Sequence, residues 1–324
     1  MRHLIMTTTL LVSLVSPTIG LSQEVLCGMT GSGSQQQVQA DRPFPSPGGM
    51  YLPTTGVIRA YVVFIQFRDH ATADGNWPVN SLASWAANFV APFANGSYPE
   101  GSLSRRMYEF SNTQLHVIGD YYPQVVVTDS NSNQYSSYGQ VNLEVLRRID
   151  QNVDFAQYDN LNRRGNYDIV PGTDNRVDLI VMVYRGVPYV DYTFYSGIAE
   201  LGFGIYTSNE GTVIEGGFPG SGITEAHAPR SGAVTPFDDA VGLAVHEIAH
   251  LFFGDGHFLR NFASLGAMSD HNGGSSFNSI ERRWLGWMDF IYVDSNPTTV
   301  TLRDFFTTGD ACAVEFGSSN QWFI

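Results

Sequence analysis

Two histidines and a glutamate in one short stretch carry the chemistry that the sequence suggests. His246 and His250 stand four residues apart in residues 245–250 (VHEIAH), and residues at this spacing share one face of a helix. Both imidazoles can therefore reach a single metal ion. Glu247 lies beside them, where it can accept a proton from water that the ion activates. The pattern predicts His246 and His250 as zinc ligands and Glu247 as a catalytic base; two histidines on an ordinary core helix with a buried, paired glutamate are the alternative.

A helix from about Asp238 to Phe253 must present these residues. Asp238 follows Pro236 and is a suitable N-cap, and the alanine, leucine and valine residues that follow favour or tolerate a helix. Gly254 is the expected stop, because glycine accepts the left-handed conformation that ends many helices. The motif then lies in the last two turns of a mostly apolar, buried helix, and a sharp turn after it can return a third ligand to the metal.

The position of that third ligand differs from the metzincin pattern H-E-x-x-H-x-x-G-x-x-H. The pattern requires glycine at 253 and histidine at 256, where this chain has Phe253 and Gly256. Gly254 is instead followed three residues later by His257, so the interval from glycine to histidine is kept and the helix is one residue longer. We therefore expect His257 to be the third ligand, with a surface-loop histidine as the alternative reading.

Two carboxylates are alternatives to His257. Asp255 lies in the same turn, and carboxylate oxygen also binds zinc. Glu281, on a later helix, would be a distant ligand, although its position beside Arg282 and Arg283 is typical of a surface-facing residue.

A methionine follows the predicted zinc helix in a tight segment. Residues 266–269 read Gly-Ala-Met-Ser, and a turn of this kind resembles the Met-turn that lies under metzincin zinc sites. Met268 would support the site from below, whereas a gap-filling core methionine is the alternative.

These stretches together resemble the secreted metalloproteases of the immune inhibitor A type and their bacterial relatives. The similarity spans most of residues 56 to 317, and four segments carry it: 56–67, 101–121, 177–184 and 246–287. The last segment holds the zinc motif, the Met-turn and a Leu-Gly-Trp ending. The resemblance implies a zinc-dependent endopeptidase with His246 and His250 as ligands and Glu247 as base. Many relatives continue with a Gly-Leu-Pro-Asp type of loop where this chain has residues 253–257, so the third ligand stays open.

The predicted fold class is α+β, or mixed α/β: a metzincin-like zinc protease domain with a twisted sheet, a zinc-binding helix and a Met-turn, followed by the start of a β-module. Apolar runs predict strands, and amphipathic stretches predict helices. The expected strands are 58–67, 114–119, 124–128, 177–184, 300–302, 311–316 and 321–324, and the expected helices are 79–93, 104–110, 141–152, 238–253 and a short one ending near Gly286.

The chain divides into four predicted parts. Residues 1–22 read as a secretory signal peptide, with cleavage after Ser22, and 23–50 as a linker or short propeptide arm. The catalytic domain is expected over 51–295. Residues 296–324 are expected to begin a C-terminal β-module that continues past Ile324. Because of the signal peptide, the protein is expected to be secreted.

The two cysteines allow two interpretations. In an oxidising compartment, Cys27 and Cys312 could pair and tie the N-terminal arm to the far end of the chain. Alternatively, the Cys27 thiolate could cap the zinc and hold the protein latent.

Composition excludes some partners. The formal net charge is −14, which argues against nucleic acid and anionic membranes as partners. The zinc-protease reading of the motif implies protein or peptide substrates. Clustered oxygens at Asp159, Asn160, Asn162, 174–175 and Asp178 suit calcium, although aspartate and asparagine also form ordinary turns. His227 could line the cleft and steady an oxyanion, but a surface histidine is the commoner case.

The predicted function is peptide-bond hydrolysis by zinc-activated water with Glu247 as general base. The rival is a catalytically inert secreted binding module that keeps zinc for structure. An intact Glu247 argues against the rival, because a structural site needs no base and usually has four protein ligands.

Overall fold

One mostly parallel β-sheet organises the molecule. The computed structural model describes residues 48–186, 197–226, 236–257, 266–268, 276–293, 300–316 and 321–323. The sheet has the order β2-β1-β6-β10-β7, with β3 beside β1. Its strands are β1 (Gly56–Gln66), β2 (Leu115–Tyr121), β3 (Val126–Val127), β6 (Leu179–Tyr184), β7 (Gly197–Ile198) and β10 (Gly222–Ala226). All neighbours pair in parallel except β7, which runs antiparallel to β10, so this mixed α/β architecture agrees with the expected class.

Both faces of the sheet are buried, which explains the near-continuous apolar run of β1. Ile58, Val62 and Phe64 point to one side, into a core that also contains the apolar residues of helix α3 (Pro236–Phe253). Val63 and Ile65 point to the other side, into a core with helix α2 (Tyr138–Ile149). The chemistry predicted from the sequence therefore lies on the α3 side of the sheet.

The other helices are shorter and begin at defined caps. Helix α1 (Leu103–Phe110) starts at Ser102, whose hydroxyl accepts from the Arg105 N–H, and α4 (Ser279–Trp284) starts at a reciprocal capping box of Asn278 and Glu281. The remaining helical segments are α5 (Phe305–Thr308) and the 3-10 turns η1 (Ala86–Asn88), η2 (Ser132–Gln134), η3 (Asp150–Asn152) and η4 (Phe155–Tyr158). None of the described helices is long and apolar enough to cross a membrane.

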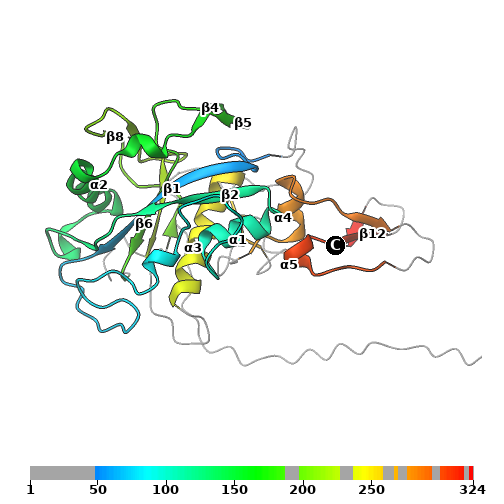
Figure 1. Ribbon diagram of the computed structural model, residues 1–324, viewed down its shortest axis with the longest axis horizontal. Coiled ribbons are helices and arrows are strands. Elements are labelled where there is room, and N and C mark those ends of the chain that lie inside the picture. Colours follow the sequence, from blue (N-terminus) through cyan, green and yellow to red (C-terminus); the bar gives the residue numbers. More distant parts are fainter. Residues whose placement is uncertain are drawn as a thin grey trace, which may run out of the picture.

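Three smaller sheets complete the described part of the fold. Two are hairpins, β4 (Leu161–Gly165) with β5 (Asp168–Pro171), and β8 (Ile205–Thr207) with β9 (Val213–Glu215). The third joins β11 (Ile291–Val293), β12 (Cys312–Phe316) and β13 (Gln321–Phe323). Figure 1 shows β12, α4 and α5 set to one side of the main sheet, away from α2.

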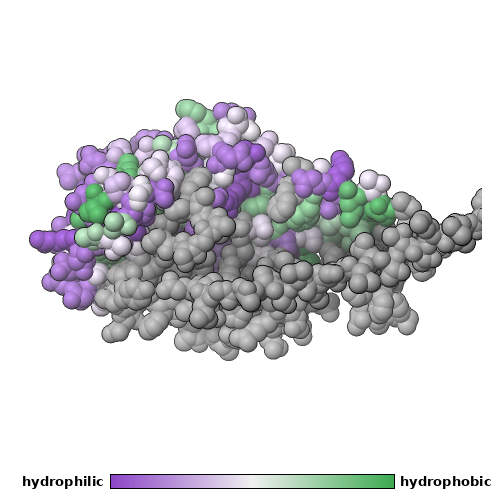
Figure 2. All heavy atoms as spheres, turned by 90° about the horizontal axis from the view of Figure 1, so that it is seen from below, coloured by the Kyte–Doolittle hydropathy of each residue, from purple (hydrophilic) through white to green (hydrophobic). Residues whose placement is uncertain are grey.

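The C-terminal sheet does not begin where the sequence suggested. Strand β11 pairs in parallel with β12, so the sheet starts at Ile291, before the expected boundary at 296. Side chains of Ile291, Tyr292 and Leu302 are exposed at this end of the molecule. Figure 2 shows a hydrophobic group there, whereas the opposite end of the same face is mainly hydrophilic.

Several predicted elements are confirmed and others are wrong. Strands β1, β2, β6 and β12 and helices α1, α2, α3 and α4 lie close to their expected positions. The helix expected over 79–93 does not form, apart from one 3-10 turn at η1. Asn80 there has a left-handed backbone (φ 58), and Trp85 and Phe89 pack around Phe64 in edge-to-face contacts that an irregular loop allows.

Three other predicted elements also differ from the structure. Helix α3 begins at Pro236, so Asp238 lies in the first turn and is not the N-cap; proline suits the first helical position, and an acidic first turn suits the helix dipole. Residues 300–302 form no strand, and the strand expected over 124–128 shortens to β3.

Candidate metal centre

Helix α3 holds three chemically active side chains in the interior. His246, Glu247 and His250 are each at most 1% exposed, because α3 packs its apolar length against the sheet. The helix ends at Gly254, which has the expected left-handed backbone (φ 98) and donates its N–H to the His250 carbonyl at 2.8 Å. This turn reverses the chain and brings His257 back over the motif.

Three imidazoles converge after that turn. One ring nitrogen from each of His246, His250 and His257 lies within 4.8 Å of the other two. The Nε2 atoms of His257 and His246 are 3.2 Å apart, and these two rings stack with an interplanar angle of 11°. Tetrahedral zinc with Zn–N bonds of about 2.0–2.1 Å separates its nitrogen ligands by about 3.3 Å. The triad can therefore hold a metal ion. Among the described residues, it is the group of His, Cys, Asp or Glu side chains whose ligand atoms lie close enough together to do so.

Hydrogen bonds orient two of the rings for coordination. The Nδ1 atom of His246 contacts the Ala267 carbonyl, and that of His250 lies 3.0 Å from the Gly254 carbonyl. Because a carbonyl only accepts, each Nδ1 carries the hydrogen, which leaves the Nε2 lone pair for a metal. Burial, reinforced by the neighbouring His257, lowers the pKa of His246 to about 4, and burial also lowers the pKa of His250. Both rings are therefore neutral near pH 7, the state that binds metal.

The carboxylate of Glu247 occupies a slot that a glycine leaves open. A Cβ atom added to Gly197 on β7 would lie 2.1 Å from Glu247 Oε1, so any other residue there would displace the carboxylate. Gly197 stands directly opposite Glu225 of β10 in the antiparallel pair. Glu225 is 1% exposed, and its pKa is raised well above the ordinary value, first by burial and then by Asp239 and Glu247.

Sequence reasoning missed Gly197 and Glu225. Strand β7 is two residues long and follows residues outside the described ranges, so no periodic pattern marks it. Glu225 could have been found only as an acidic residue in an otherwise uncharged strand.

The structure separates the candidates for the third ligand. His257 belongs to the triad, whereas Asp255 is exposed and stands outside it. Glu281 is not surface-facing, which corrects the sequence interpretation: it is 1% exposed, and its carboxylate accepts hydrogen bonds from the backbone N–H groups of Ala267, Met268 and Asn278. The amphipathic pattern was misleading because Glu281, a capping residue of α4, packs against the backbone of residues 266–268.

Met268 is fully buried in the core that contains α3, as a residue supporting the site must be. His227 and Cys27 lie outside the described residues, so the predicted oxyanion contact, the cysteine pairing and the latency contact stay predictions.

Neither family models nor curated proteins match this chain. Its function must therefore be argued from the site.

The oxygens proposed for calcium serve backbone turns instead. The two carboxylate oxygens of Asp159 accept from the N–H groups of Asp174 and Asn175, at 3.0 and 2.8 Å. Asp178 accepts from two further backbone N–H groups, those of Asn160 and Leu161. Because each of these carboxylates accepts from two backbone amides, the geometry favours turn chemistry over a calcium site.

Asp178 gives the stability a predictable dependence on pH. Its side chain is fully buried, and burial raises its pKa from 3.8 to about 7, although two amides and Arg163 oppose the shift. The folded state keeps this proton between about pH 4 and pH 7 while the unfolded state releases it, so this contribution to stability is present below pH 4 and is lost as the pH rises to 7.

Asp178→Asn should remove that dependence, because asparagine resembles the protonated carboxyl and does not titrate. Between pH 4.5 and pH 8, the free energy of unfolding measured in urea should be higher for the variant than for wild type, by up to a few kcal/mol. Asp168→Asn, at an exposed position on β5, is the control and should follow wild type. If the unfolding free energies of Asp178→Asn and wild type changed with pH in the same way, Asp178 would not be the source of this dependence.

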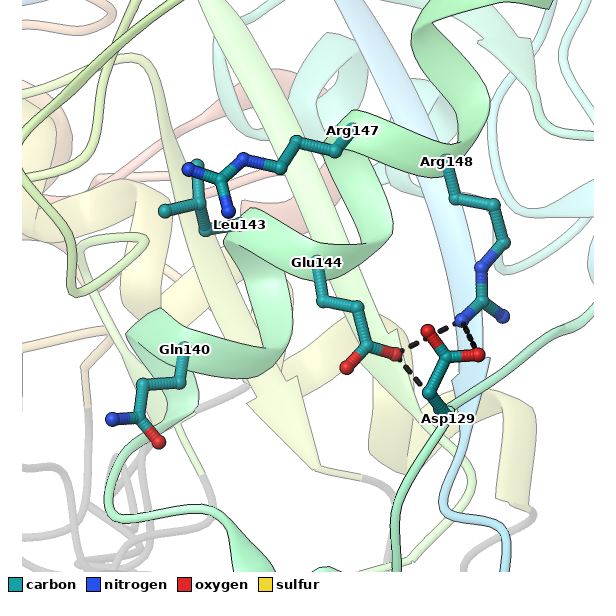
Figure 3. Close-up of a pocket in the computed structure, with 6 residues that line it drawn as sticks. All are labelled: Asp129, Gln140, Leu143, Glu144, Arg147 and Arg148. Carbon is teal, nitrogen blue, oxygen red and sulfur yellow. Dashed lines mark hydrogen bonds and ion pairs between the residues drawn. The ribbon is translucent and has the colours of Figure 1, made fainter.

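A surface hollow of about 610 Å³ lies away from the triad, along helix α2. Arg148 bridges Asp129 and Glu144 at its edge, with ion pairs of 2.6 and 3.0 Å (Figure 3). Arg148 is held by these two ion pairs, and α2 covers the opposite face of the sheet from α3. The hollow therefore contributes nothing to the metal centre.

Proposed function

We propose that the protein is a secreted zinc-dependent endopeptidase of the metzincin type, similar to the immune inhibitor A metalloproteases. The observation that carries the proposal is the convergence of three imidazoles beside one buried carboxylate. His246, His250 and His257 would hold the zinc. Three protein ligands leave a fourth position for water or substrate, which is the arrangement of catalytic zinc sites.

The chain's own residues supply the proton transfers. A bound zinc ion lowers the pKa of water and polarises the scissile carbonyl. Glu247 accepts the proton of the attacking water and passes it to the nitrogen of the leaving amine. The open backbone at Gly197 keeps room for this carboxylate, and the Ala267 and Gly254 carbonyls hold two ligand rings in the required tautomer.

The strand next to the base suggests a peptide as substrate. Among the described residues β7 is the last strand of the main sheet, and it lies against Glu247. An extended peptide can add to a sheet edge through backbone hydrogen bonds, which would bring a peptide bond to the base.

A non-catalytic module with structural zinc is the competing function. A structural site closes the metal with four protein ligands and needs no neighbouring carboxylate. Here the described ligand group has three members, and Glu247 is buried on the same helix as two of them.

Metal analysis with a casein digestion assay tests the proposal. Purified protein should contain zinc and digest casein, should lose the activity with a chelator, and should recover it when zinc is restored. Bound zinc without any peptide hydrolysis would favour the structural module instead.

A further inference from the structure

Glu281 holds the segment under the metal centre from below. Its carboxylate accepts from the N–H groups of Ala267 and Met268, both at 2.9 Å, and from the Asn278 N–H at 2.8 Å. Bonds from amides to a carboxylate are stronger than those between neutral groups. The contact is also crowded, because a Cβ on Gly266 would lie 2.4 Å from the Asn278 side-chain nitrogen and 2.6 and 2.8 Å from the two oxygens of Glu281.

One peptide group connects Glu281 with a zinc-binding ring. The peptide between Ala267 and Met268 is planar; its N–H donates to Glu281 Oε1, and its carbonyl accepts from Nδ1 of His246. An acceptor oxygen on the N–H side polarises the peptide and strengthens the carbonyl as an acceptor. A stronger acceptor on Nδ1 fixes the ring and makes Nε2 a better donor to a metal.

We propose that Glu281 is a positioning residue for His246, acting through the Ala267–Met268 peptide. It would complete a carboxylate–peptide–histidine–metal series in which the carboxylate never touches the ion. This inference rests on the proposed zinc site, and it concerns metal affinity and ligand orientation rather than proton transfer.

The competing role for Glu281 is purely structural. It is the third residue of the capping box that begins α4, where Asn278 accepts from the Glu281 N–H and Glu281 accepts from the Asn278 N–H. Glutamine serves equally well at that position of a capping box. Glu281→Gln therefore keeps the cap but has one oxygen and an NH2 group where three backbone donors converge.

Zinc affinity of Glu281→Gln separates the two roles. Competition with a chromophoric chelator should show affinity about 10- to 100-fold below wild type, the usual effect of losing an outer-shell partner. The visible spectrum of the Co²⁺-substituted variant should change, since it reports ligand geometry. Asn278→Ala is the matched control: it removes the cap from the same helix, so it should lower thermal stability but bind zinc within about twofold of wild type.

Gly266→Ala tests the same contact from the other side. Its added methyl group meets both the Asn278 amide and the Glu281 carboxylate, and Asn278→Ala shows how much of its effect comes from the amide. Displacement of the carboxylate should lower zinc affinity, and the double variant with Glu281→Gln should lose less than the two single losses combined. Wild-type affinity and an unchanged cobalt spectrum in Glu281→Gln would overturn the inference, as would an equal affinity loss in Asn278→Ala. These readouts need no substrate, so zinc binding without peptide hydrolysis would contradict only the proposed activity.

Discussion

Glu247→Gln should remove most peptide hydrolysis while the zinc stays bound. The amide matches the shape of the carboxylate in the slot beside Gly197 but cannot accept a proton from water. We expect kcat to fall by about 100- to 10,000-fold, the range of general base catalysis. Peptide turnover, zinc content and thermal stability of the same preparation check this result.

Glu100→Gln provides the control for that experiment, since its side chain is exposed and belongs to an ion pair far from α3 in sequence. It should keep wild-type turnover. If Glu247→Gln turned over peptides at nearly the wild-type rate with full zinc content, another group would have to be the base.

Removing any one histidine of the triad should release the metal. His246→Ala, His250→Ala and His257→Ala each delete one of three converging nitrogens, so zinc content after dialysis should fall from about one per chain to near zero. Asp255→Ala is the matched control two residues from His257. Because Asp255 is exposed and outside the triad, that variant should keep its zinc. Zinc retained by His257→Ala and lost by Asp255→Ala would make Asp255 the third ligand.

Much of the site could be predicted from the sequence because its information is local. Helical spacing placed His246 and His250 on one face, and the glycine that ends α3 made the return of His257 predictable. The apolar run of β1 was similarly clear, since a strand buried on both faces leaves a continuous hydrophobic pattern.

What could not be predicted depends on tertiary contacts. Glu281 resembles an exposed helical residue until α4 packs it against the backbone of residues 266–268. The role of Gly197 becomes visible only in the folded structure, where the Glu247 carboxylate occupies the space that a side chain at position 197 would fill. Tertiary packing also explains why the helix predicted over 79–93 is absent. Trp85 and Phe89 pack around Phe64, and this packing overrides the local helical pattern.

The turn at Gly254 has a consequence for how the site assembles. The outermost ligands, His246 and His257, are eleven residues apart, whereas other contacts of the fold join residues as distant as Thr54 and Trp287, with a separation of 233. Closing a short loop costs little entropy, and local contacts form faster than distant ones. Once α3 and its turn exist, the three imidazoles can meet before the long-range pairings of the chain are complete. Ala267 and Glu281 come from farther along the chain, so the contacts that align His246 close longer loops than the turn that brings the three imidazoles together.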